Sequence, residues 1–168
     1  MSSAAQIITP NPEIPCTPGL CLVYVRETFD LPAKYPSATA SWGASEHKHT
    51  DKEFPDNVWV PVWYSLADEP NGHVALRQPD GSVWSASHPT NTTPVHHDSM
   101  QDIESYYGGR LKYLGWTEDL SGEMIIELNG ASSTPAQLSG VAELEAIQDG
   151  DPAAIVLTVD NKQNKKPR

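Results

Sequence analysis

Residues 17–26 read Thr-Pro-Gly-Leu-Cys-Leu-Val-Tyr-Val-Arg, and they decide the fold prediction because they describe a helix with a cysteine in its first turn. Thr17 is a favoured N-cap residue, and Pro18 suits the first helical position. A thiol at Cys21 would lie near the positive end of the helix dipole, where the thiolate is favoured. Apolar residues have helical spacing at Leu20, Val23 and Tyr24, and Phe29 beyond the segment can continue the stripe.

His73 supplies the second half of a nucleophile–base pair. It lies in residues 72–76, Gly-His-Val-Ala-Leu, which predict a strand. Because a thiol becomes a strong nucleophile when an imidazole removes its proton, Cys21 and His73 are the candidate nucleophile and general base of a cysteine hydrolase. The alternatives are a small buried hydrophobic role for Cys21 and a surface position at a strand end for His73. Cys16 precedes the helix and lacks this setting.

The rest of the pattern predicts a small α+β domain with a mostly antiparallel sheet. Two segments predict helices, a short one followed by a long loop within 33–57 and another at 99–107. Strands are predicted at 58–64, 73–77, 82–87, 112–116 and 124–128, with turns at 68–72 and 78–81. The expected organisation is an extended N-terminal arm at 1–15, a folded domain at 16–128 and a linker or C-terminal appendage at 129–168.

The chain resembles the CHAP and NlpC-type cysteine peptidoglycan hydrolases, in which a helix carrying cysteine precedes a hairpin carrying histidine. Several segments within residues 14–128 are similar, in order and spacing, to the catalytic domains of phage endolysins: 18–22 with 25–26, 60–63, 72–75, 80–85 and 115–120. The resemblance implies a compact papain-like fold, with the cysteine helix packed on the sheet. It also implies amidase or endopeptidase cleavage of an amide bond in the bacterial cell wall, with no metal or organic cofactor.

The third catalytic residue, which orients the imidazole, is the least defined part of the site. In CHAP-like enzymes it is usually Glu, Asn or Asp on the strand after the histidine, but here that strand offers only Ser85 and Ser87. We take Ser85 as the candidate, with Asn91 and Asp98 as substitutes, and expect Cys21 to act with its histidine as a dyad. A two-residue turn at 80–81 would place Trp84 and Ala86 beside the histidine, whereas an odd-length loop or a bulge would place the serines there.

Composition limits the classes of partner. A net charge of −11 over 168 residues argues against charge-driven binding to nucleic acid or to anionic lipid. No stretch approaches the ~20 apolar residues of a membrane span, and no signal peptide is recognisable. Two cysteines are too few for a disulfide scaffold, so both are expected as thiols. One domain of ordinary size, and a monomer, are expected.

A metal site is the alternative chemistry. His47 and His49, with Glu46, Asp51 and Glu53 around them, could share a zinc ion only if His96, His97 or Asp98 completed the ligand set. A solvated polar loop is the favoured interpretation, and no metal is assigned. Most of the five tryptophans are expected in the core or in a groove wall.

These patterns lead to one functional expectation and one alternative. The expectation is an endolysin-like peptidoglycan hydrolase of a bacteriophage, an antimicrobial enzyme that lyses the cell wall. By the same resemblance, it would stay in the host cytoplasm until released to the wall, or travel in a virion tail. The alternative is a non-catalytic cell-wall or tail-associated binding module on the same fold.

Overall fold

The computed structural model describes residues 2–87 and 91–129, which form three helices and a mostly antiparallel sheet. The predicted α+β class is therefore confirmed at this level. A compact unit, Met1–Glu127, includes the segment predicted as an N-terminal arm. Nearly all of the predicted linker or appendage at 129–168 lies outside the described residues. None of the described helices is long and apolar enough to cross a membrane.

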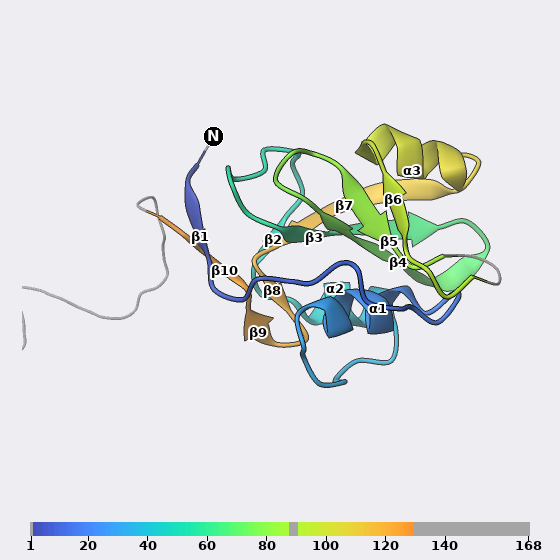
Figure 1. The fold of residues 1–168 in the computed structure, drawn as a ribbon, viewed down its shortest axis with the longest axis horizontal. Helices are drawn as coiled ribbons and strands as arrows, with labels where there is room; N and C mark the ends of the chain where they lie inside the picture. Colours follow the sequence, from blue (N-terminus) through green and yellow to red (C-terminus); the bar gives the residue numbers. More distant parts are fainter. Residues whose placement is uncertain (1, 88–90, 130–168) are drawn as a thin grey trace, which may run out of the picture. The chain divides into compact units, whose positions relative to one another are not determined.

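A six-stranded antiparallel sheet is the centre of the fold (Figure 1). Its strands, in spatial order, are β2 (Lys48–His49), β7 (Leu111–Thr117), β3 (Val60–Leu66), β4 (Glu69–Arg77), β5 (Val83–Ser85) and β6 (Val95–His97). Strands β3 and β4 form a hairpin in which Leu66 opposes Glu69. The turn is therefore Ala67–Asp68, with Asp68 in the left-handed region at φ 64°, a conformation that Asp tolerates. The prediction of a turn over 68–72 is correct only at Asp68, because residues 69–72 extend β4 instead.

The register between β4 and β5 determines whether Ser85 lies on the same face of the sheet as His73. Leu76 opposes Trp84 and Arg77 opposes Val83, so five residues connect the two strands. Of the two predicted registers, the odd-length loop is the one observed. Because side chains alternate along a strand, Ser85 lies on the same face of the sheet as His73.

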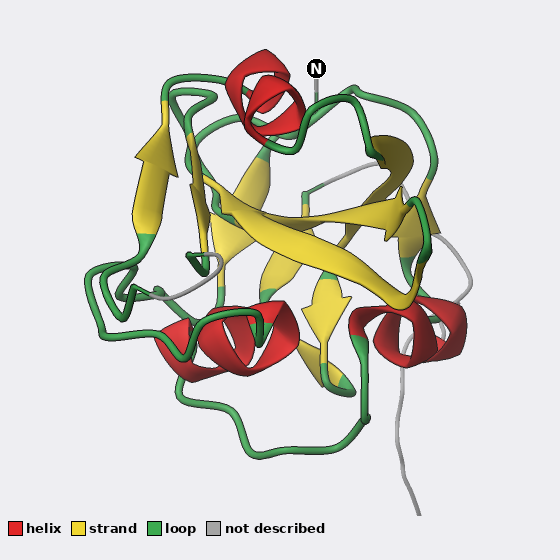
Figure 2. Ribbon diagram, turned by 90° about the vertical axis from the view of Figure 1, so that its right-hand side faces the viewer, coloured by secondary structure: helices red, strands yellow, loops and turns green. Residues whose placement is uncertain are grey.

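Helices cover both faces of the sheet: α1 (Cys21–Thr28) and α2 (Ala38–Ala44) lie on one side, and α3 (Met100–Tyr106) lies on the other (Figures 1 and 2). Helix α1 starts later than predicted. Its N-cap is Leu20, not Thr17. Gly19 has a left-handed backbone conformation at φ 79°, so the right-handed helix begins only after it. Cys21 is thus the first residue of the helix. Helix α3 matches its prediction, with the Ser99 hydroxyl accepting a hydrogen bond from the Asp102 N–H.

Three short strands and the N-terminal strand complete the fold. Strand β8 (Asp119–Leu120) pairs with β9 (Glu123–Met124), and β1 (Ala4–Gln6) pairs with β10 (Ile126–Leu128). The Gln6 side chain accepts a hydrogen bond from the Trp59 N–H at 2.7 Å and donates to the Ile125 carbonyl at 3.2 Å. The start of the predicted arm is therefore a strand that is hydrogen-bonded to two distant parts of the chain.

Candidate active site

A cavity of about 260 Å³ lies where the first turn of α1 meets the beginning of β4 and the end of α3. Cys21 and His73, the predicted nucleophile and base, both line it. Other residues of its wall include Tyr35, Ala38, Glu69, Gly72, Tyr107 and Arg110. Ser85 is buried in the sheet and does not line this cavity. The fold thus brings together two residues that are 52 positions apart in the sequence, and these two define the candidate site.

Cys21 lies at the beginning of α1, where backbone N–H groups have no partner within the helix. Burial raises the pKa of the Cys21 thiol, as does the nearby Glu69 carboxylate. Hydrogen bonds to the sulfur from the backbone of Val74, Leu22 and Cys21 itself act in the opposite direction. Because burial has the larger effect, the pKa stays above its ordinary value and the resting group is a neutral thiol. The sequence predicts stabilisation of the thiolate by the helix, but not the larger effect of burial.

The Cys21 thiol lies close to β4. The backbone of Val74, the residue after His73 in that strand, acts on the sulfur and lowers its pKa. Strand β5 ends at Ser85, one residue before the position that would oppose Val74 in the observed register.

His73 is buried in β4, where Tyr64 opposes it across the hairpin. Its imidazole also packs against the ring of Tyr107, with the ring centroids 4.8 Å apart. Burial raises the pKa of Tyr107, and a negative charge on Cys21 raises it further. Tyr107 therefore lies within reach of both candidate catalytic residues. In the sequence, Tyr107 is only the last residue of the helix predicted at 99–107, and no local pattern marks its contact with His73.

No family model, curated protein or solved structure matches this chain. What the protein can do is therefore inferred from the chemistry of its cavity.

Ser85, the candidate third residue, has a histidine partner other than His73. Its hydroxyl lies 3.0 Å from Nε2 of His97, and both residues are buried. Burial lowers the pKa of His97, Asp102 raises it, and His96 lowers it. The shared sheet face keeps Ser85 near His73, but the hydrogen bond to His97 engages its hydroxyl. Its role in orienting His73 stays a prediction.

The two substitutes for Ser85 have local roles. The Asn91 side chain accepts a hydrogen bond from the Thr93 N–H at 2.9 Å, and its carbonyl accepts one from the Ser87 hydroxyl. Asp98 precedes the N-cap of α3, and its N–H donates to the Asp102 carboxylate at 3.1 Å. Neither residue lines the cavity.

Cys16 is buried away from the cavity wall. Its sulfur accepts a hydrogen bond from the Ser87 N–H at 3.4 Å and lies 3.7 Å from the Asn91 carbonyl oxygen. Both cysteines are free thiols, as predicted. The contacts of Cys16 connect the segment before α1 to the segment after β5, which is a structural role.

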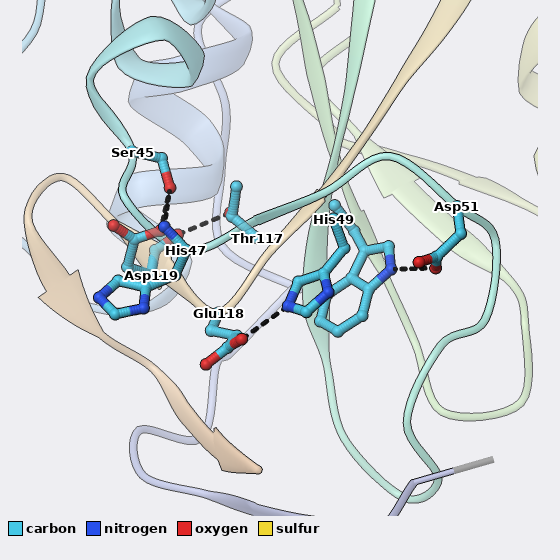
Figure 3. A network of polar contacts seen from close by, with 8 residues as sticks. Ser45, His47, His49, Asp51, Thr117, Glu118 and Asp119 are labelled. Carbon is cyan, nitrogen blue, oxygen red and sulfur yellow. Dashed lines mark hydrogen bonds and ion pairs between the residues drawn. The ribbon is translucent and has the colours of Figure 1, made fainter. Parts of the chain in front are cut away.

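The histidines of the predicted polar loop belong to a separate network at the edge of the sheet (Figure 3). Nε2 of His49 lies 2.6 Å from a Glu118 carboxylate oxygen, and its ring stacks on Trp116 at a centroid distance of 3.9 Å. The Trp116 N–H donates to Asp51. His47 takes part in this network through its backbone, because its N–H donates a hydrogen bond to the Ser45 hydroxyl.

The alternative zinc site is not assembled. Strand β2 carries His49 and strand β6 carries His96 and His97, and these strands form opposite edges of the six-stranded sheet. Within residues 2–87 and 91–129, no group of three or more His, Cys, Asp or Glu side chains is arranged to hold a metal ion. The network around His49 instead connects β2 to the β7–β8 region.

Proposed function

We propose that this protein is a cysteine-dependent peptidoglycan hydrolase with a compact papain-like fold, similar to the CHAP-type catalytic domains of phage endolysins. The observation that carries the proposal is the cavity lined by both Cys21, the first residue of α1, and His73 of β4. A nucleophile at a helix N-terminus beside a buried imidazole suits acyl transfer from an amide. The order of these elements supports the family assignment.

The reaction begins from a neutral thiol, because burial raises the pKa of Cys21. His73 takes the thiol proton as the sulfur attacks the carbonyl carbon of the scissile amide. The Cys21 N–H, which contacts the sulfur in the resting state, donates to the developing oxyanion. His73 then gives its proton to the departing amine as the C–N bond breaks, leaving a thioester. Water activated by His73 hydrolyses the thioester and restores the thiol.

Tyr107 supports this chemistry by position. Its ring packs against His73 and its hydroxyl lies within electrostatic reach of Cys21. A ring in this place limits the motion of the imidazole and keeps water from one side of it. Tyr107 is therefore a positioning residue in the proposed mechanism.

The proposed substrate is the peptide part of bacterial peptidoglycan, cut by amidase or endopeptidase action without a cofactor. In keeping with the resemblance to phage endolysins, the protein would accumulate in the host cytoplasm and act when it reaches the wall, or act from a virion tail. The overall negative charge suits neither nucleic acid nor an anionic membrane as partner.

One observation favours the alternative, a wall-binding module without catalysis. The raised pKa of Cys21 leaves a neutral thiol, which is a weak nucleophile unless His73 removes its proton. The pH dependence of Cys21 alkylation by iodoacetamide separates the two functions. In the hydrolase, His73→Gln slows alkylation near neutral pH, whereas in the binding module the variant and the wild type react at equal rates.

Digestion of purified peptidoglycan is the direct test. The wild-type protein is expected to release fragments whose masses identify one cleaved amide bond, and Cys21→Ser is expected to release none. Sacculi that remain intact with a folded wild-type protein, but still bind it, would replace the hydrolase by the binding module.

A further inference from the structure

The cavity wall carries two arginines in a strongly acidic chain. Its described residues with acidic or basic side chains, other than histidine, cysteine and tyrosine, are Arg26, Glu69 and Arg110. The whole chain has a net charge of −11. The guanidinium groups are therefore the part of the wall suited to a ligand carrying negative charge.

Arg26 is engaged by the protein itself. It is half-buried, its guanidinium donates to the Leu31 carbonyl at 2.7 Å, and it lies 3.7 Å from the Glu27 carboxylate. These contacts attach the end of α1 to the loop that follows it. Glu27 therefore offsets the charge of Arg26, and the Leu31 carbonyl takes up part of its donor group.

Arg110 differs from Arg26 because it is exposed and lies at the rim. Its backbone is fixed to the β3–β4 turn, since its carbonyl accepts the Ala67 N–H at 2.9 Å. Its guanidinium donates to the Ala67 carbonyl at 3.0 Å. A guanidinium has five N–H donors in a rigid plane, so this one bond orients the group while other donors stay available to a ligand.

The position of Arg110 relative to the nucleophile follows from Tyr107. The Arg110 N–H donates to the Tyr107 carbonyl at 3.2 Å, and Tyr107 is the residue that packs on His73. The charges of Arg110 and of Cys21 both act on the Tyr107 hydroxyl. Arg110 and the proposed reacting sulfur are thus both neighbours of Tyr107.

We propose that Arg110 is a specificity-determining residue that binds a free carboxylate of the substrate, next to the amide that Cys21 attacks. The substrate class is then a peptide with an unblocked carboxylate beside the scissile bond. An oriented guanidinium pairs with both oxygens of a carboxylate, which a neutral amide cannot match. This proposal deepens the proposed function and rests on it, because the ligand is a substrate only if the protein is a hydrolase. Carboxylate binding beside Cys21 is measurable without that premise.

The test uses two small alkylating reagents that differ in one group. Iodoacetate and iodoacetamide both transfer a two-carbon unit to the thiolate with loss of iodide, but only iodoacetate carries a carboxylate. The rate of modification of Cys21 by each reagent is measured by mass spectrometry of the Cys21 peptide. The ratio of the two rates reports the preference of the cavity for a carboxylate and cancels any change in thiol pKa.

Arg110→Gln is expected to lower the iodoacetate-to-iodoacetamide ratio by about fivefold, the effect of one nearby charge in a well-hydrated site. Arg110→Lys should retain part of the preference, since it keeps the charge but not the planar fork. The matched control is Lys48→Gln in β2, which removes one positive charge outside the cavity wall. It should leave the ratio unchanged.

An unchanged ratio in Arg110→Gln, or an equal fall in Lys48→Gln, would overturn the carboxylate site. The iodoacetamide rate alone shows whether a variant still forms the cavity around Cys21. Failure of peptidoglycan digestion with a normal fall in the ratio would reject the hydrolase and keep the carboxylate site. Peptidoglycan digestion together with a ratio that does not depend on Arg110 would reject the carboxylate site and keep the hydrolase.

Discussion

The Ser85 hydroxyl and Nε2 of His97 lie 3.0 Å apart in the buried part of the sheet. They come from neighbouring strands, β5 and β6, and the ring of Tyr106 packs edge-on against His97. Ser85 thus has a partner that the sequence does not suggest. Its removal should affect the stability of this edge of the sheet more than the chemistry of the cavity.

Ser85→Ala is expected to lower the free energy of unfolding by about 1–2 kcal/mol, because it removes the hydroxyl partner of a buried imidazole. Turnover should fall only modestly, whereas His73→Ala should remove essentially all of it. Urea denaturation and initial rates on peptidoglycan measure the two effects. If folded Ser85→Ala were as inactive as His73→Ala, the serine would be the group that orients the catalytic imidazole.

His97 should make stability depend on pH. Burial lowers its pKa in the folded protein, so between that pKa and the ordinary value of about 6.5 the unfolded chain binds more protons. The free energy of unfolding should therefore decrease as the pH falls below about 6.5 and level off below the folded pKa. His97→Gln should flatten this part of the stability curve, measured by urea denaturation from pH 8 to pH 5. The exposed His47, beside β2 at the opposite edge of the sheet, supplies the control His47→Gln, and equal slopes in all three proteins would contradict the prediction.

The two cysteines should respond differently to substitution. Cys21→Ser is expected to abolish wall lysis, because a serine hydroxyl is a far weaker nucleophile than a cysteine thiolate. Cys16→Ser should retain most of the activity, since that sulfur contacts Ser87 and the Asn91 carbonyl oxygen and does not line the cavity. Turbidity of a sacculus suspension measures both. Equal loss in two folded variants would indicate a structural role for the pair.

The network at β2 should matter for stability and not for catalysis. Replacing both His47 and His49 by Ala should leave most of the activity, and EDTA should have little effect. The double variant should lose about 1 kcal/mol of stability through the half-buried His49–Glu118 pair and its stacking on Trp116. Activity lost to chelation and restored by zinc would reject this account.

Gly72 is a sharp test of the cavity wall. Its backbone has φ 70°, and an added Cβ would lie 2.6 Å from the Thr39 hydroxyl oxygen and 3.1 Å from the Tyr64 carbonyl oxygen. Gly72→Ala should therefore lower the free energy of unfolding by about 2 kcal/mol and reduce activity. Gly43→Ala is the matched control, because its Cβ meets nothing within 4 Å inside α2. It should be neutral or stabilising by up to about 1 kcal/mol in thermal melts.

The elements with strong local signals are the ones that the sequence predicts well. Ser99 at an N-cap and two glycines after the last turn define α3, and both glycines adopt positive φ. The turn signal at 80–81 gives the β4–β5 hairpin, although its register depends on the full length of the connection. Cys21 and His73 are paired by nucleophile–base chemistry and by the resemblance to cysteine hydrolases, and both line one cavity.

Other features depend on contacts that no local pattern contains. Strands β2 and β6 are two and three residues long, and each exists only because it pairs with one neighbour. The late start of α1 depends on the left-handed conformation of Gly19. Tyr107 reads as an ordinary helix-end aromatic residue, and its place against His73 appears only when α3 covers the sheet. The raised pKa of Cys21 has the same origin, since burial is a property of the packed structure.

The hydrogen bonds of Gln6 have a consequence for how the protein is made. Its partners Trp59 and Ile125 are 53 and 119 residues further along the chain. A ribosome synthesises β1 before the other described strands, and domains generally fold as units as the chain emerges. Strand β1 must therefore wait for β10 through the synthesis of nearly every other described element. Closing so long a loop late is entropically costly, and it makes the earliest of the described strands one of the last to be completed.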